Sequence, residues 1–145
     1  MSFSLDLKRF ADKADVNMAT AVRKTVMEIG ARLVEKTPVG DATLWKSPPP
    51  KGYVGGRAKA NWQYGFNSAP PGDLPDIDPS GAVSIQSISG VFEQPVAGIH
   101  YLTNNLPYAQ RLEDGWSTQA PYGMVGLTLI EAPQIVEEAA REANK

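Results

Sequence analysis

The side chains that could support catalysis are few and lie far apart in the sequence. His100 is the single histidine, and cysteine is absent, which removes thiolate catalysis, disulfides and most zinc sites. General base catalysis needs a positioned partner, and a metal site needs several ligands. On a strand, the His100 side chain would point away from Ile99 and Tyr101. We therefore interpret His100 as a structural or exposed residue rather than a catalytic one.

Three further motifs have a chemical alternative to a structural role. Asp73, Asp76 and Asp78 are crowded like the ligands of a calcium loop, but they lack its sixth-position glycine and terminal glutamate. Gly55-Gly56-Arg57 lacks the flanking strand, the helix start and the Lys-Ser/Thr ending of a phosphate-binding loop. Ser117 lies in no glycine-flanked nucleophile elbow. The sequence predicts no catalytic, cofactor-binding or metal site here.

The charges are distributed unevenly, although the net charge is only −2. Residues 1–67 carry 11 Lys/Arg and 6 Asp/Glu (+5), and residues 68–145 carry 3 Lys/Arg and 10 Asp/Glu (−7). Both halves could simply be solvated. Alternatively, the basic half of one subunit meets the acidic half of the next, as in head-to-tail rings. The basic half also offers a local face for nucleic acid, although the whole domain is not basic.

Hydrophobic periodicity predicts several helices. In the longest, from about residue 16 to 36, Val22, Val26, Ile29 and Leu33 share one face, Asp15 is a candidate N-cap, and Thr37-Pro38 ends the helix. Residues 82–92 are ambiguous between strand and helix; we favour a helix with Ser80 as its N-cap. The other expected helices span residues 5–14, 108–114 and about 131–144.

Alternating patterns predict strands over residues 58–66 and 96–103, and extended loops over 38–56 and 69–81. From Tyr122 we expect a strand through Val125, Leu127 and Leu129, with a helix beginning at Pro121 as the alternative. No apolar run approaches the ~20 residues of a membrane span, and the charged N-terminus does not resemble a signal peptide. We expect one α+β domain over residues 1–145, with the long N-terminal and C-terminal helices packed on a small, mainly antiparallel sheet.

Aromatic and turn-forming residues concentrate between Ile99 and Val125. Trp116 lies in a polar loop and is therefore a candidate for a subunit interface. Arg111 and Glu113 flank a short helix, and either could pair across a subunit boundary. We expect Trp62 to anchor a strand on the long helix, and Asn104 and Pro107 to set a turn.

Three blocks of this chain resemble the neck proteins of long-tailed double-stranded DNA phages, which complete the tail and join it to the head. The first block ends in Thr37-Pro38-Val39, and the second contains Gly56-Arg57-Ala58 and Asn61-Trp62. The third runs from Ile99 to Val125 and contains Tyr101-Leu102-Thr103-Asn104-Asn105, Pro107-Tyr108-Ala109, Leu112-Glu113 and Gly123-Met124-Val125. In most relatives only a short turn separates Thr-Pro-Val from the arginine that corresponds to Arg57. The resemblance therefore implies that Gly40 to Gly55 is an insertion in this chain.

The resemblance implies a structural virion protein, not an enzyme, assembled in the host cytoplasm and located at the head–tail junction. It implies a ring of identical subunits, hexameric by the family resemblance, around the channel that DNA crosses without sequence recognition. The implied partners are a head-closure or connector protein and a tail terminator or tail tube protein. An acidic C-terminal half would suit the channel wall. The candidate residues of this chain for a subunit interface or a scaffold role are Arg57, Asn61, Trp62, Asn104, Pro107, Tyr108, Arg111, Glu113 and Trp116.

Other functions stay open at this point. Within the neck, the chain could instead be a tail terminator or a head-closure protein. Outside it, the alternatives are a nucleic-acid-binding module that uses the basic half and the loop over residues 38–56, and an enzyme that uses His100.

Overall fold

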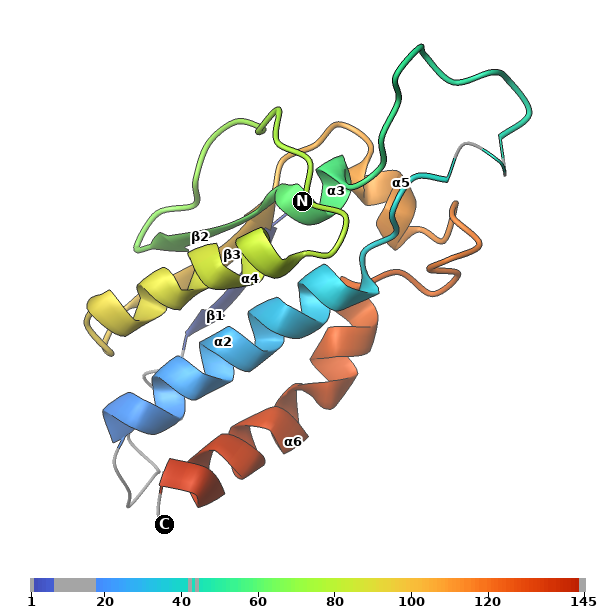
Figure 1. Ribbon diagram of the computed structural model, residues 1–145. Coiled ribbons are helices and arrows are strands. Elements are labelled where there is room, and N and C mark those ends of the chain that lie inside the picture. Colours follow the sequence, from blue (N-terminus) through green and yellow to red (C-terminus); the bar gives the residue numbers. More distant parts are fainter. Residues whose placement is uncertain (1, 7–17, 42, 44, 144–145) are drawn as a thin grey trace.

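A three-stranded antiparallel sheet lies behind a layer of helices (Figure 1). The computed structural model describes residues 2–6, 18–41, 43 and 45–143. β3 (Ile99–Asn104) is the central strand, with β1 (Ser2–Asp6) on one side and β2 (Trp62–Phe66) on the other. The register pairs Leu102 with Phe3 and with Tyr64. The described residues thus show the predicted α+β class with an antiparallel sheet.

The helical layer consists mainly of two long antiparallel helices, α2 (Met18–Lys36) and α6 (Val125–Ala143), which lie side by side in Figure 1. α4 (Ala82–Ile88) lies on the other side of α2 and continues into the 3-10 helix η2 (Ser89–Glu93). Two short helices, α3 (Arg57–Ala60) and α5 (Ala109–Glu113), lie near one end of the sheet. No helix in the described part of the chain is long and apolar enough to cross a membrane.

The main core lies between α2 and the elements on either side of it. Val22, Val26, Ile29 and Leu33 of α2 are buried, which confirms the predicted apolar face. Ile29 and Leu33 belong to a cluster that joins β2, β3, α4 and α6 through Trp62, Leu102, Ile88 and Ile135. Each fully buried side chain of this size contributes about 1.5–3 kcal/mol relative to exposure.

The long helix approaches α4 closely at a glycine. A Cβ at Gly30 would lie 2.8 Å from Cδ1 and 2.9 Å from Cγ2 of Ile88. Ile88 is fully buried at this contact. The small residue therefore sets the separation of α2 and α4, because any larger side chain would have to displace Ile88.

Several predicted elements are confirmed. The long helix predicted from about residue 16 is α2, which includes Met18 to Lys36. Residues 82–93 are helical, as favoured. The short helix α5 ends before Gly115, which has a φ of +86°. The helix over 82–88 has Gly81 rather than Ser80 at its N-cap position, but the Ser80 hydroxyl still accepts a hydrogen bond from the N–H of Ala82 at 3.2 Å. The Asp15 N-cap lies outside the described residues.

Three predictions are wrong. Residues 58–60 belong to the helical turn α3, so the strand begins only at Trp62. Ser2–Asp6 form β1, which contradicts a helix from Leu5, and the remainder of that predicted helix lies outside the described residues. The strand expected from Tyr122 is instead the beginning of α6, which starts at Val125 and is closer to the alternative helix from Pro121.

Candidate functional site

Asn61 holds the loop over residues 69–81 onto the body of the protein. Its side chain is completely buried. The Asn61 oxygen accepts from the N–H of Leu74 at 2.6 Å, and its nitrogen donates to the carbonyl oxygen of Leu74 at 3.0 Å and to that of Arg57 at 2.8 Å. The amide therefore replaces a strand partner for Leu74 and also satisfies the end of α3.

Arg57 strengthens the same attachment from the surface. Its Nε donates to the Leu74 carbonyl at 3.1 Å, and its Nη2 lies 3.0 Å from Oδ2 of Asp73. The adjacent loop carbonyls of Pro70 and Gly72 accept from the side-chain nitrogen of Asn105 at 2.7 and 2.9 Å. Arg57 thus helps to hold the loop over residues 69–81 against α3.

Trp62 ties the start of β2 to the end of α2, as the sequence predicts. The indole N–H donates to Oγ1 of Thr37 at 2.7 Å, and the ring is 1% exposed. The Thr37 hydroxyl in turn donates to the carbonyl oxygen of Leu33 at 2.6 Å, so one hydroxyl joins strand and helix. Burial of an indole with its N–H satisfied contributes both apolar area and orientation.

The turn after β3 is built around a buried amide. Asn104 Oδ1 accepts from the N–H of Leu106 at 3.2 Å, and its Nδ2 donates to the carbonyl oxygen of Ala58 at 2.9 Å. This asparagine turn precedes the exposed Pro107, and Tyr108 follows at the N-cap position of α5. The turn therefore places the partly exposed Tyr108 ring at the surface.

Glu113 caps the second long helix. Its carboxylate accepts hydrogen bonds from the N–H groups of Met124 and Val125 at 2.8 Å and of Gly126 at 3.0 Å. These are free donors at the start of α6, where negative charge is also favoured by the helix dipole. Glu113 is thus a scaffold residue, and its carboxylate is engaged within the chain rather than free to pair across a boundary.

A second amide holds the loop over residues 38–56, and sequence reasoning missed it. Gln119 accepts from the N–H of Val39 at 3.1 Å and donates to the carbonyl oxygen of Val39 at 2.7 Å. The ends of this loop meet closely, since a Cβ at Gly55 would lie 2.2 Å from the carbonyl oxygen of Gly40. We call residues 40–55 the arm; in Figure 1 it projects away from the helical layer.

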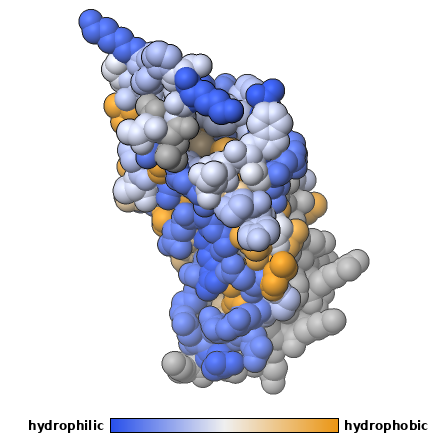
Figure 2. All heavy atoms as spheres, turned by 90° about the vertical axis from the view of Figure 1, so that its right-hand side faces the viewer, coloured by the Kyte–Doolittle hydropathy of each residue, from blue (hydrophilic) through white to orange (hydrophobic). Residues whose placement is uncertain are grey.

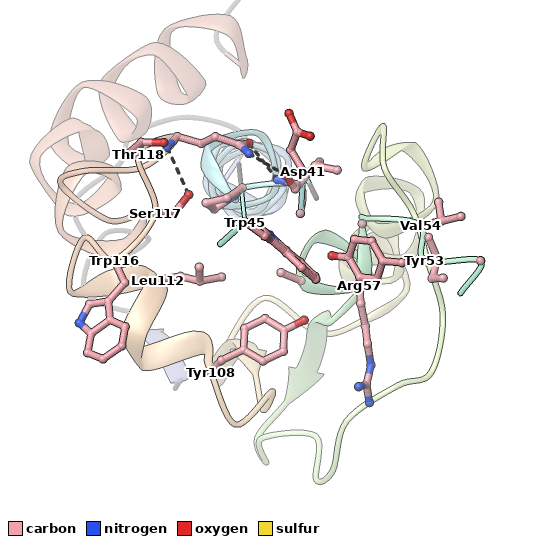
Figure 3. A pocket seen from close by; sticks show the side chains of 18 of the residues that line it. Asp41, Trp45, Tyr53, Val54, Arg57, Tyr108, Leu112, Trp116, Ser117 and Thr118 are labelled. Atoms are coloured by element: carbon pink, nitrogen blue, oxygen red, sulfur yellow. Dashed lines mark hydrogen bonds between the residues drawn. The ribbon is translucent and has the colours of Figure 1, made fainter. Parts of the chain in front are cut away.

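A pocket of about 890 Å³ lies between the arm and the body. Its walls come from the arm, the start of α3, residues 75–77, α5 and the loop after α5. Figure 3 shows Trp45, Tyr53 and Tyr108 around this space, with Leu112 on one wall and Trp116 at the edge. The Trp45 and Tyr53 ring centroids are 4.6 Å apart. The arm is thus packed through its own aromatic side chains, as in a compact surface loop.

Arg111 and Trp116 form a pair at the edge of the pocket. The guanidinium carbon of Arg111 lies 5.0 Å from the centroid of the Trp116 ring, within cation–π range. Trp116 is still 72% exposed. The pair presents an exposed aromatic ring with a positive charge against it, and the interface role of Trp116 stays a prediction.

Ion pairs between α2 and α6 compensate part of the charge asymmetry within one chain. Glu131 contacts both Arg32 and Lys36, and Glu142 lies 3.2 Å from Lys24. The hydrogen bonds from Lys36 and Arg32 lower the pKa of Glu131, and those to Glu131 and Glu28 raise the pKa of Arg32. Basic groups of the first half thus meet acidic groups of the second half within one chain.

His100 is a buried structural residue. Its Nδ1 lies 2.6 Å from the Tyr64 hydroxyl and its Nε2 lies 3.3 Å from the carbonyl oxygen of Val96. With Nε2–H donating to Val96, Nδ1 accepts from Tyr64. Burial lowers the pKa of His100, with nearby Arg23 adding to the effect, and burial raises the pKa of Tyr64 to about 12. The imidazole is therefore a neutral hydrogen-bonding residue at neutral pH.

Two of the three aspartates in the loop over residues 69–81 bind other parts of the chain. Asp73 pairs with Arg57, and Asp78 accepts from the N–H of Ser84 at 2.9 Å near the start of α4. Among the described residues, no group of three His, Asp or Glu side chains is arranged to hold a metal ion.

Comparisons of this chain with protein-family models, with curated proteins and with solved structures find no match. The function is therefore inferred from the residues and contacts of the chain itself.

Proposed function

We propose that this chain is a structural protein of the neck of a long-tailed double-stranded DNA phage. In this role it completes the tail and joins it to the head, as a ring around the DNA channel. A tail terminator or head-closure role in the same neck is the neighbouring alternative. The sequence resemblance over Leu5–Val39, Gly56–Trp62 and Ile99–Val125 motivates the proposal.

One observation supports a structural role more than any other. Four polar side chains of the segment over residues 99–125 bind the backbone of the chain itself: Asn104 at a turn, Asn105 and Gln119 on loops, and Glu113 on α6. A catalytic segment would instead present positioned polar groups to a cavity. In this segment the four polar side chains fix the shape of the backbone. The exposed aromatic rings of Tyr108 and Trp116 are left to contact a partner.

The ion pairs of the basic half favour this role over nucleic-acid binding. Lys24, Arg32, Lys36 and Arg57 each contact a carboxylate of the same chain. Phosphate binding depends on cations that can exchange small counterions for phosphate. Five other basic side chains of the described residues form no ion pair. Three of them have contacts within the chain: Arg23 donates to Gln94, Lys59 donates to Glu35, and Arg111 lies over Trp116. Lys46 and Lys51 of the arm are then too few for a basic stripe.

Reconstitution tests the proposal. Heads and tails are prepared from a lysate of a phage whose copy of this gene carries an early stop codon, and purified protein is added. Recovery of infectious particles in proportion to added protein is expected if the chain joins tail to head. A mixture in which titre stays at the background level, although the protein is folded, would contradict the proposal.

A further inference from the structure

The exposed large hydrophobic side chains of the described residues gather mainly at two places. Six line the pocket under the arm: Trp45, Tyr53, Val54, Ile77, Tyr108 and Trp116. Three more lie at the start of α6 or just before it, where Tyr122, Leu129 and Ile130 are 78%, 51% and 77% exposed. Grouped exposed apolar side chains mark interaction sites.

Leu129 and Ile130 of the second group belong to a stripe along the outer side of α6. One face of the helix carries residues at steps of three, one, three and four positions: Gly126, Leu129, Ile130, Pro133 and Glu137. The buried residues of α6, Thr128, Ile135 and Ala139, lie on the opposite face. No described element of this chain covers the stripe, since Ile130 is largely exposed.

The pocket has the shape and chemistry to receive such a stripe. Its volume falls within the range of about 300–1,000 Å³ typical of binding pockets, and its lining is largely apolar and aromatic. Figure 3 shows Trp45 and Tyr108 facing the same space from the arm and from α5. Aromatic grooves bind amphipathic helices through side chains spaced at i, i+3, i+4 and i+7, which is the spacing of the α6 stripe.

We infer that the pocket of one copy binds the outer stripe of α6 of a second copy, with Ile130 and Leu129 against the aromatic rings under the arm. This inference rests on the proposed neck ring and names the contact that would build it. Pocket and stripe are different patches of the surface, so the contact is head-to-tail and can propagate around a closed ring.

The charges that remain after internal pairing have complementary signs. The arm carries Lys46, Lys51 and one carboxylate, Asp41. None of the three forms an ion pair with a described residue, so the arm keeps a net positive charge. The outer part of α6 carries Glu138, which forms no ion pair with a described residue and accepts a hydrogen bond from Gln134. Opposite charges at the rim of an apolar contact steer encounter and fix its register. Figure 2 shows hydrophobic groups between hydrophilic ones on the side of the molecule that faces right in Figure 1.

Cysteine crosslinking tests the contact, because the natural chain contains no cysteine. Val54→Cys in the arm and Ile130→Cys on α6 are purified separately, mixed, and treated with a short bis-maleimide. Val83→Cys on α4 is the matched control, since Val83 is also an exposed aliphatic residue and lies in neither patch. The mixture of Val54→Cys with Ile130→Cys should give a covalent dimer at least several-fold above either single variant and above mixtures that contain Val83→Cys.

A chain that carries both cysteines distinguishes ring-type from two-fold contacts. The head-to-tail contact predicts a ladder of dimers, trimers and larger species. Crosslinking of the mixed variants at the Val83→Cys level would overturn the inference, and so would a doubly linked dimer without larger species.

This test is separate from that of the proposed function. Restored titre in the reconstitution without the crosslink would refute the contact and leave the neck role intact. The crosslink without restored titre would establish self-association through these patches and refute the neck role.

Discussion

The Asn61 side chain binds both backbone polar groups of Leu74, accepting from its N–H at 2.6 Å and donating to its carbonyl oxygen at 3.0 Å. Gln119 binds both polar groups of Val39 in the same manner. Each side-chain amide pairs with the N–H and the carbonyl group of one residue, as the backbone of a neighbouring β-strand would. The two long loops, over residues 38–56 and 69–81, are thus anchored at Val39 and at Leu74.

Replacement of Asn61 by Ala should destabilise the protein and release the second loop. The Leu74 N–H and carbonyl lose their buried partner, at a cost of about 1–3 kcal/mol in the free energy of unfolding. Urea denaturation measures that loss, and limited proteolysis should show earlier cleavage within residues 69–81. Gln63→Ala is the control, because it removes one exposed hydrogen bond to Gly72 and should change stability by less than about 0.5 kcal/mol. Equal stability of the Asn61 variant and the parent would contradict the anchor role.

Trp62 should contribute more to stability than any other side chain of β2. Trp62→Ala removes a fully buried indole and should cost about 3–5 kcal/mol. Trp62→Phe retains much of the apolar packing but loses the N–H donated to Thr37, so its cost should be smaller. Thermal melts of the three proteins should rank parent, Phe and Ala in that order. Superimposable melts of the Ala variant and the parent would exclude the observed burial.

Removal of the Glu113 carboxylate should loosen the first turn of α6. Glu113→Ala leaves the N–H groups of Met124, Val125 and Gly126 without their acceptor, and loss of a helix cap costs about 0.5–2 kcal/mol. Hydrogen exchange should accelerate at these amides. Glu137→Ala, on the exposed face of the same helix, should leave their exchange unchanged. Unaltered exchange in the Glu113 variant would show that the cap contributes nothing.

Mild acid should destabilise the protein through His100. Its pKa is lowered in the folded state from the ordinary value of 6.5, because burial disfavours the imidazolium. Below pH 6.5 the unfolded chain then binds more protons than the native one, so stability is full above that pH and falls as pH drops toward the folded pKa. The free energy of unfolding should therefore decline between about pH 7 and pH 5, and His100→Leu should show a shallower decline over that window. Identical slopes would contradict this linkage.

The long-range anchors explain which elements sequence patterns predicted and which they did not. The α2 face was predictable because Val22, Val26, Ile29 and Leu33 repeat at helical spacing and all four are buried. Residues 58–60 were predicted as a strand because small alanines fit alternation equally well. In the fold, Ala58 packs against Leu106 and Ala109, and Ala60 closes a turn onto Gly56, so tertiary contacts decided the conformation.

The sequence pattern did not predict where α6 begins, for a similar reason. Val125, Leu127 and Leu129 alternate as in a strand, and Pro133 in the interior disfavours a helix. The cap that initiates this helix comes from Glu113, 11 residues before Met124, where no local motif reveals it. The aromatic pocket could not be predicted either, because it depends on how Gln119 positions the base of the arm.

The most direct test of the neck role is electron microscopy of a lysate from a phage whose copy of this gene carries an early stop codon. The proposal predicts filled heads lying beside separate, full-length tails, with joined particles restored when the gene is supplied in trans. Normal, joined virions in the absence of the protein would contradict it.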